Sequence, residues 1–310
     1  MEIYNPLVSI IIPVYNGSNF VSEAIDSALN QTYKNIEIIV VNDGSNDNDA
    51  TFNAVSKYGD KVVYYTKTNG GCASALNYGI KRAHGEFISW LSHDDIYLPE
   101  KIEWQINMYS RYNLDKKNTA ITSLGELIDR GGHKIFHPKV SKKGFLKPID
   151  AFKHLLFRQC FNGCGLLLPA CFFENGVYFN EDMRFLLDWD LWLKFAIDGK
   201  SFFSDKHILV GSRVHSEQVT FKQKELHILE TEKSVDEVFK YIKDNDKVQF
   251  AKCLYYFSYA TKKGNYKEIQ EYLKTKGKYI SCVKKYYYKV RFNLIKFAKK
   301  IYHKLRCIKK

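Results

Sequence analysis

Hydrophobic and polar positions alternate between two periodicities in the first hundred residues. Residues 7–14 (LVSIIIPV) form a nearly continuous β-branched run, which is typical of a strand buried on both faces of a parallel sheet. Apolar residues then recur at helical spacing up to residue 29. A second buried run predicts a strand at 36–41. The alternation continues with helices around 47–58 and 72–83, and with strands at 62–65 and 86–91.

This β-α-β-α-β-α-β order predicts an α/β domain on a parallel sheet with right-handed crossovers. Proline is favoured at the first position of a helix, so Pro99 is expected to begin the next one. The second half of the chain has a different pattern. It predicts a hairpin over 120–136 with its turn at 129–132, helices near 149–158 and 183–198, strands at 165–168 and 201–210, and helices from about 222 onward.

We expect a mainly parallel central sheet followed by a helical C-terminal region. The predicted boundaries place a catalytic domain at 1–220, with halves at 1–110 and 111–220, and a helical extension at 221–310. A chain of 310 residues, 45% of them hydrophobic, can bury a core of this size.

The charge is concentrated at the C-terminal end. Of the 47 Lys and Arg residues, thirteen lie in residues 275–310, which contain no Asp or Glu. The remaining 34 equal the 34 acidic residues, so the body is neutral although the net charge is +13. A neutral body does not indicate nucleic acid as a partner.

The cysteines and the lengths of the apolar runs indicate in which cellular compartment the protein is expected. Seven scattered cysteines, the lack of a cleavable N-terminal leader and the lack of an apolar run near 18 residues predict a cytoplasmic protein without a transmembrane helix. Cys160 and Cys164 lack the second pair or the histidine that a zinc site requires.

Three predicted strands end in polar clusters, at residues 13–16, 42–45 and 92–95. Ligands of such sheets bind outside the carboxyl ends of the strands, so the clusters are expected to converge on one crevice. Asp43 can accept hydrogen bonds from a nucleobase or ribose there, or it can form a helix cap or Asx turn.

Asp94 and Asp95 are adjacent carboxylates, which repel each other unless a cation or hydrogen-bond donors offset their charge. An oxygen-lined site with few protein ligands suits Mg²⁺ or Mn²⁺, with diphosphate oxygens and water completing the shell. The alternative is a solvated turn that caps the following helix.

Asp188 and Asp190 lie on one predicted helix and point about 200° apart, so they cannot both face one cleft. An Asp that faces a cleft from this apolar helix would have a raised pKa, suited to a general base. The alternative is a salt-bridged helix carboxylate. His215 can contact a metal or diphosphate, or it can be structural, and the Gly70-Gly71 pair is a weak indication of a phosphate loop.

The ordered segments together resemble glycosyltransferase family 2, the inverting family with the GT-A fold. The resemblance rests on segments in the same order along residues 7–220: VSIIIPVYNG at 8–17, QTY at 31–33, IIVVNDGS at 38–45, NGG at 69–71, ALNYG at 75–79, GEFI at 85–88, LSHDD at 91–95, DWDLWL at 188–193 and RVH at 213–215. It implies a glycosyltransferase that uses a nucleotide-sugar, with UDP-sugars favoured, and Mn²⁺ or Mg²⁺.

The resemblance also implies residue roles. Asp43 matches the aspartate that recognises the base, and Asp188 matches the catalytic base. The remaining residues that it places near the donor or metal are Pro13, Tyr15, His93, Asp94 and His215, the last two also as metal ligands. Two positions depart from the family pattern: Ser92 replaces the first aspartate of the metal-binding D-x-D element, and Leu76 stands where many relatives have Arg.

The basic C-terminal segment predicts an amphipathic helix. Its apolar positions recur at steps of three and four: Val283, Tyr287, Val290, Leu294, Phe297, Ile301, Leu305 and Ile308. A cationic polar face suits an anionic membrane surface, so we expect a peripheral membrane protein. Attachment to a membrane in turn suits an acceptor that is a glycan or a lipid-linked glycan of a bacterial-type surface polysaccharide. The alternative is a packing helix or a coiled-coil seam.

Three other functions compete with catalysis of sugar transfer. An inactive relative that only binds nucleotide-sugar is kept open by Ser92. A dinucleotide-dependent oxidoreductase would require G-x-G-x-x-G after the first strand, and no such motif is present. A nucleotidyltransferase would require a Gly-rich basic loop where Tyr15-Asn16-Gly17 stands.

Overall fold

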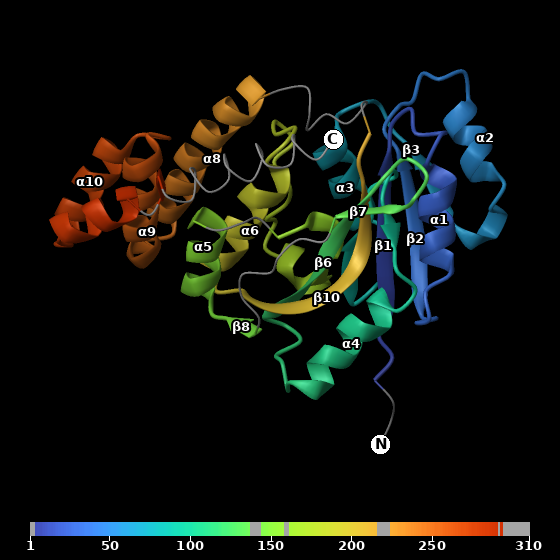
Figure 1. The fold of residues 1–310 in the computed structure, drawn as a ribbon, viewed down its shortest axis with the longest axis horizontal. Helices are drawn as coiled ribbons and strands as arrows, with labels where there is room; N and C mark the ends of the chain where they lie inside the picture. Colours follow the sequence, from blue (N-terminus) through green and yellow to red (C-terminus); the bar gives the residue numbers. More distant parts are fainter. Residues whose placement is uncertain (1–3, 137–143, 158–160, 216–223, 291, 294–310) are drawn as a thin grey trace.

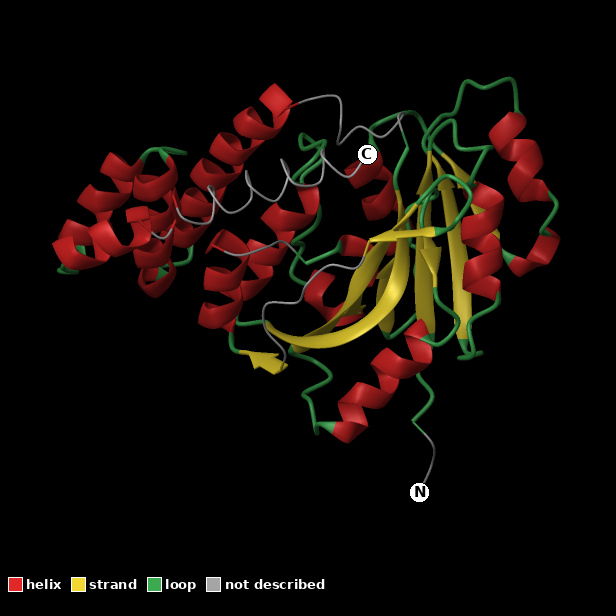
Figure 2. Cartoon of the chain, in the orientation of Figure 1, coloured by secondary structure: helices red, strands yellow, loops and turns green. Residues whose placement is uncertain are grey.

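A computed structural model describes residues 4–136, 144–157, 161–215, 224–290 and 292–293. A twisted sheet forms the centre of the molecule, with helices on both faces, and a group of helices extends from one end (Figures 1 and 2). Within these residues the sheet contains ten strands: β1 (Val8–Val14), β2 (Ile36–Asn42), β3 (Val63–Thr66), β4 (Phe87–Trp90), β5 (Ile96–Tyr97), β6 (Thr119–Ile128), β7 (Lys134–Phe136), β8 (Gly144–Leu146), β9 (Leu166–Pro169) and β10 (Ser201–Arg213).

The strand order is β3-β2-β1-β4-β9-β6-β10-β5, with β7 beside β6 and β8 beside β10. The N-terminal half is parallel, as the β-α alternation predicts: β1 pairs in parallel with β2 and β4, and β2 with β3. β9 is antiparallel to both β4 and β6 and so joins the two halves. The fold is therefore an α/β fold with a mostly parallel sheet and antiparallel additions in the second half.

The helices described are α1 (Val21–Leu29), α2 (Ala50–Ser56), α3 (Cys72–Ile80), α4 (Lys101–Arg111), α5 (Pro148–Phe157), α6 (Leu187–Ile197), α8 (Lys224–Asp244), α9 (Val248–Thr261) and α10 (Tyr266–Thr275). The predicted hairpin over 120–136 is confirmed by the antiparallel pairing of β6 with β7. Pro99 is not the first residue of its helix, because α4 begins at Lys101. The Pro99 carbonyl instead accepts the Thr32 amide at 2.8 Å.

The continuous apolar character of β1 reflects burial on both faces. All seven of its residues are buried, and neighbouring residues contribute to different cores. Ile10 and Ile12 pack with α1 and α4, whereas Ile11 packs with α3 on the opposite face. This is the behaviour expected of a central parallel strand covered by helices on each side.

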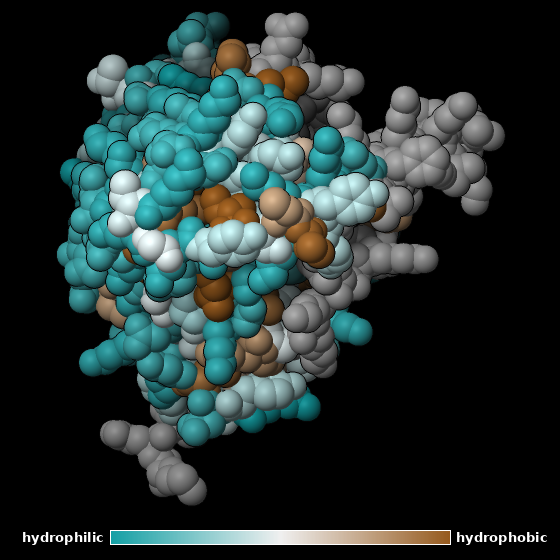
Figure 3. Space-filling view, turned by 90° about the vertical axis from the view of Figure 1, so that its left-hand side faces the viewer, coloured by the Kyte–Doolittle hydropathy of each residue, from teal (hydrophilic) through white to brown (hydrophobic). Residues whose placement is uncertain are grey.

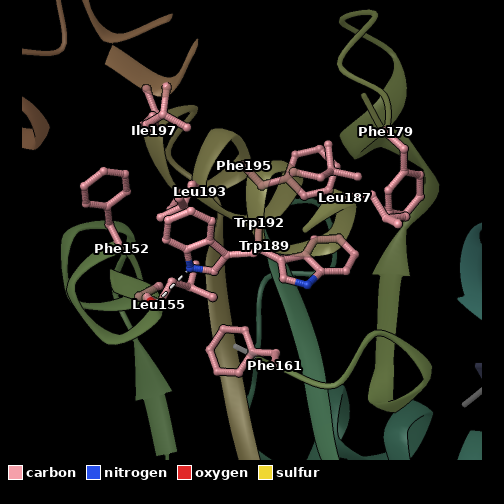
Figure 4. Packing of buried hydrophobic residues seen from close by; sticks show 14 of the residues in the cluster. Phe152, Leu155, Phe161, Phe179, Leu187, Trp189, Trp192, Leu193, Phe195 and Ile197 are labelled. Atoms are coloured by element: carbon pink, nitrogen blue, oxygen red, sulfur yellow. Dashed lines mark hydrogen bonds between the residues drawn. The ribbon is translucent and has the colours of Figure 1, made fainter. Parts of the chain in front are cut away.

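Helix α6 is buried on almost every face, which its sequence of aromatic and aliphatic residues requires. Trp192, Leu193 and Phe195 are fully buried, and the Trp189 indole donates to the Leu155 carbonyl at 3.0 Å (Figure 4). The helix is covered by α5 and α8, so its position is fixed by packing from both sides. Any polar group that it carries is consequently held in a defined place.

Helices α8, α9 and α10 form the extension, at the end of the molecule opposite α1 and α2 (Figure 1). Residues 282–290 are also helical. Of the eight apolar positions predicted for the basic amphipathic helix, Val283, Tyr287 and Val290 are described and exposed, and the other five lie outside the described residues. Among the described residues, no helix combines the length and apolar character needed to cross a bilayer.

Candidate functional site

The carboxyl ends of β1, β2 and β4 meet at one edge of the sheet, as the sequence predicts. Val14 at the end of β1 is paired with Asn42 at the end of β2, and the Asp43 amide donates to the Val14 carbonyl at 2.8 Å. β4 runs parallel to β1 on its other side. The polar segments that follow the three strands therefore leave the sheet together.

Asp43 organises the loop that follows β3. Its carboxylate is 3% exposed and accepts the Lys67 ammonium at 2.8 Å, the Gly70 amide at 3.0 Å and the Gly71 amide at 2.6 Å. These charge-assisted bonds hold the loop against the end of β2. Lys67 was not singled out by the sequence, because the pairing depends on the adjacency of β2 and β3.

Asn42, rather than Asp43, makes the Asx turn at this position. Its side-chain oxygen accepts the Ser45 amide at 2.9 Å. Helix α2 begins after Asp49 without a side-chain cap. Asp43 is thus neither the turn residue nor the helix cap, and its contact with a nucleobase stays a prediction.

Pro13 and Tyr15 occupy different depths at the end of β1. Pro13 is buried within the strand, whereas Tyr15 is 42% exposed at the edge of the sheet. The Tyr15 hydroxyl donates to the Asn46 side chain at 3.4 Å, and Asn16 donates to the same oxygen at 2.7 Å. The loops after β1 and β2 are joined by these bonds.

His93 is turned toward the β1 loop. Desolvation lowers the pKa of its imidazole, while a hydrogen bond to the Pro13 carbonyl and the charge of Asp94 act in the opposite direction. A Cβ on Gly17 would lie 2.4 Å from the His93 ring, so only glycine fits beside it. His93 therefore shapes the end of β1.

Asp94 and Asp95 are separated by their environments. The Asp94 carboxylate is partly exposed and lies 3.0 Å from His215 Nε2. Asp95 is buried and accepts the Arg213 amide at 2.9 Å. Burial, followed by the charge of Asp94, raises the pKa of Asp95 to about 7. Of the two, only Asp94 keeps a partly exposed carboxylate.

Arg213 fixes this pair, a role that the sequence motif alone did not indicate. It is 1% exposed, and its Nε donates to the Asp94 carbonyl at 2.9 Å. It also forms an ion pair with Glu23 of α1. The Phe20 ring lies under its guanidinium, with 4.7 Å between the guanidinium carbon and the ring centroid. A buried arginine with several partners holds the backbone of residues 94 and 95 in place.

Ser92 lies next to the buried Asp95, whose amide donates to the Ser92 carbonyl at 3.1 Å. The Ser92 backbone amide donates to the Cys164 sulfur at 3.3 Å, and the Cys164 thiol donates to the Ser92 hydroxyl at 3.4 Å. A second carboxylate at this position would adjoin the desolvated Asp95, which carries a raised pKa already. The serine avoids that repulsion.

Asp188 and Asp190 separate as their spacing predicts. Asp190 is fully buried and bonded to the Lys194 ammonium at 2.6 Å and the Ser234 hydroxyl at 3.0 Å, so it is the ion-paired member. Asp188, in the first turn of α6, is partly exposed, and its Oδ1 accepts the Trp189 amide at 2.7 Å.

Cys72 brings the candidate carboxylates together. It is the first residue of α3, and burial, followed by the charges of Asp94, Asp43 and Asp188, raises the pKa of its thiol to about 12. Two carboxylates from loops and one from the first turn of α6 are therefore close enough to the start of α3 for their charges to act on this thiol. No sequence signal identified Cys72, because its neighbours come from distant parts of the chain.

A metal at this site would have few protein ligands. Within the described ranges, no group of three or more His, Cys, Asp or Glu residues is arranged to hold an ion. Asp94 Oδ2 and His215 Nε2, 3.0 Å apart, are the pair with suitable donor atoms. They fit a divalent cation whose other ligands come from a diphosphate and water.

The sheet edge, its three carboxylates and the order of strands define the class of protein: a glycosyltransferase with the GT-A fold. A family model described as "Glycosyl transferase family 2" matches residues 9–124. An uncharacterized glycosyltransferase of Rickettsia typhi is 50% identical over 217 residues, which cover 70% of this chain and 67% of that protein. The chain belongs to glycosyltransferase family 2.

Other relatives are longer than this chain. The match to an uncharacterized glycosyltransferase of Rickettsia felis is 51% identical and covers 36% of that protein. A hyaluronan synthase of Pasteurella multocida is 30% identical over 242 residues, which cover 74% of this chain and 23% of the synthase. The chain thus corresponds to one part of these larger proteins.

Solved structures share the fold at low sequence identity. TarS of S. aureus, residues 1–349 in complex with UDP-GlcNAc, has a TM-score of 0.64 at 17% identity, over 81% of this chain and 71% of that one. The mannosyltransferase PcManGT of Pyrobaculum calidifontis, in complex with GDP-Man and Mn²⁺, has a TM-score of 0.55 at 16% identity, over 76% of this chain and 65% of that one. These likenesses confirm the α/β fold.

Proposed function

We propose that the chain transfers a sugar, with inversion, from a nucleoside diphosphate sugar to an acceptor hydroxyl. The observation that carries the proposal is the meeting of Asp43 and Asp94 at the carboxyl ends of β2 and β4, with the segment before Asp188 hydrogen-bonded through Arg184 to the Asp43 loop. UDP-sugars are the favoured donors. The complex of TarS with UDP-GlcNAc, on the same fold, supports this choice.

Each carboxylate has a part in the proposed reaction. Asp43 and the loop it holds bind the nucleoside, together with Pro13 and Tyr15. Asp188 accepts the proton of the acceptor hydroxyl as its oxygen attacks the anomeric carbon, and the bond from that carbon to the diphosphate oxygen breaks. Asp94 and His215 would hold Mn²⁺ or Mg²⁺, which supplies positive charge for the leaving diphosphate. The Mn²⁺ complex of PcManGT supports this metal chemistry.

The acceptor is proposed to be a glycan or a lipid-linked glycan of a surface polysaccharide. The similarity to a hyaluronan synthase supports a glycan acceptor. The basic C-terminal segment supports a peripheral position on the cytoplasmic face of a membrane, where lipid-linked acceptors are found. The division into a catalytic region at 1–220 and an extension at 221–310 remains a prediction.

The test replaces the proposed base. Asp188→Asn is expected to bind UDP as the wild type does, while release of UDP from the best UDP-sugar falls by a factor of about 10² or more, since base catalysis contributes 10² to 10⁴. Calorimetry and a coupled UDP-release assay measure the two quantities, with Mn²⁺, Mg²⁺ and EDTA arms. Normal turnover by this variant would exclude Asp188 as the base.

The matched control is Asp182→Asn, because its carboxylate is 77% exposed and pairs with Lys233 at the surface. It should leave turnover unchanged. A wild-type chain that binds UDP but turns over no donor in any metal arm would instead support the competing function of an inactive nucleotide-sugar-binding protein.

A further inference from the structure

One carboxylate of the extension binds the segment that leads into α6, the helix that carries Asp188. Glu230 of α8 is 4% exposed, and its two oxygens accept three consecutive backbone amides that lead into α6: Arg184 at 2.7 Å, Phe185 at 2.8 Å and Leu186 at 3.0 Å. The residue before α6 provides no side-chain cap of its own. Hydrogen bonds to a charged carboxylate are stronger than neutral ones, so Glu230 holds this segment firmly.

A second contact lies one turn further along α8. The Ser234 hydroxyl donates to Asp190 at 3.0 Å, and Asp190 is also paired with Lys194. Glu230 and Ser234 are four residues apart and so lie on one face of α8. Together they hold the first turn of α6 at both sides of Asp188.

The same segment contacts the loop that Asp43 holds. The Arg184 guanidinium donates to the Gly70 carbonyl at 3.3 Å, and the Gly70 amide donates to Asp43 at 3.0 Å. Hydrogen bonds thus run from Glu230 through residues 184–186 to the loop at Asp43. A shift of the segment would change the place of Asp188 relative to the nucleoside site.

We infer that Glu230 is a positioning residue for the transfer reaction: from the helical extension, it holds Asp188 at a fixed place relative to the donor loop. The inference rests on the proposed role of Asp188. Glu230 itself touches neither substrate nor the reacting atoms. The extension is therefore part of the machinery that sets the reaction geometry, and small displacements of such groups reduce rates strongly.

Glu230→Gln keeps the size of the side chain but leaves one acceptor oxygen for three amides. We expect kcat for UDP release to fall about tenfold or more, with the dissociation constant for UDP within about twofold of the wild type. The control is Glu232→Gln, two residues away, whose carboxylate is 43% exposed and pairs with Lys263. It should behave as the wild type. An unchanged kcat in Glu230→Gln, or an equal loss of UDP binding, would overturn the inference.

A double variant separates this inference from the base assignment. If Glu230 acts through Asp188, the Asp188→Asn, Glu230→Gln double variant should be no slower than Asp188→Asn alone. Additive losses would contradict the positioning role even though Asp188 is the base, whereas an active Asp188→Asn would reject the base assignment itself. If Glu230→Gln fails to fold, Ser234→Ala can be used instead, because it removes a single hydrogen bond to α6. A kcat of Ser234→Ala equal to that of the wild type would count against the inference.

Discussion

At the scale of single residues, environment gives neighbouring carboxylates different chemistry. Asp94 retains partial exposure and a histidine partner, while Asp95 is buried against the amide of Arg213. The raised pKa of Asp95, about 7, follows from that burial, and the charge of Asp94 adds to it. Two adjacent aspartates thus divide into one that can meet a ligand and one that supports the backbone.

Lys101 gives a prediction at this scale. Its ammonium is fully buried, 2.9 Å from the Ser89 hydroxyl and 2.9 Å from the Gln105 side-chain oxygen, and burial lowers its pKa from 10.5 to about 7. Unfolding therefore takes up a proton between these two values. The free energy of unfolding is expected to rise from about pH 7 toward pH 10. Asp95 affects the free energy of unfolding in a separate range, from about pH 4 to 7. There the folded chain keeps the Asp95 proton and the unfolded chain does not, so the free energy of unfolding falls as pH rises.

Urea unfolding at pH 7, 8 and 9 measures this dependence. Lys101→Met should lose the rise, because it removes the titrating group, although it also leaves Gln105 without one partner. The exposed Lys57→Met serves as the control. A slope that is equal in Lys101→Met and the wild type would show that Lys101 does not titrate in this range.

At the scale of elements, the loop between β3 and α3 meets the segment before α6. Gly71 has a φ of +90°, and a Cβ there would lie 1.9 Å from an Arg184 guanidinium nitrogen. The Gly71 amide is also bonded to Asp43. The backbone conformation restricts this position to glycine, and any side chain there would also displace the Arg184 guanidinium.

Gly71→Ala is therefore expected to lower the melting temperature by several degrees and to weaken UDP binding about tenfold or more, since the loop must move away from Asp43. Thermal unfolding and calorimetry check the two effects. Gly176→Ala is the matched control, because Gly176 has a φ of +75° and a Cβ there would meet no atom within 4 Å. Gly176→Ala should lose stability without losing UDP affinity. If Gly71→Ala and Gly176→Ala bind UDP equally well, the loop at Gly71 does not contribute to binding.

The strands and helices of the first half were predictable, because each has one dominant periodicity. β1 and β2 begin and end within one residue of their predicted limits, and Asp188 and Asp190 point apart as helix geometry requires. The antiparallel insertion of β9 was not predictable, since four buried residues carry no sign of their direction. Partners such as Lys67 of Asp43 depend on which strands are adjacent, which only the folded chain determines.

At the scale of the whole molecule, the end of the extension, residues 276–290, combines lysines with exposed apolar groups. Tyr279, Val283 and Tyr286 are 78%, 79% and 73% exposed, while Tyr288 packs inward on the rings of Phe157 and Tyr256. The face at this end is largely hydrophilic, with apolar residues gathered near its centre (Figure 3). An exposed mixture of apolar and cationic side chains suits an anionic bilayer.

The triple substitution Tyr279→Ser, Val283→Ser, Tyr286→Ser should reduce sedimentation with vesicles that contain phosphatidylserine about tenfold, because it removes apolar insertion and leaves the Lys residues. Substitution is preferable to truncation at about residue 275, which would also uncover Phe157 and Tyr256. A control with Phe52→Ser and Ile135→Ser, both exposed elsewhere, should bind normally. Unchanged vesicle binding by the triple variant would reject this surface as the contact.

The hydrogen bonds from α8 to α6 and to the segment before it have a consequence for anyone who wishes to shorten or recombine this protein. A cut between residues 220 and 221 would leave the three amides of residues 184–186, before α6, and the buried Asp190 without partners from the extension. The first 220 residues cannot be treated as an interchangeable module, even though the family resemblance ends there. A minimal active fragment, or a chimaera with a new C-terminal part, should retain α8 through Asp244.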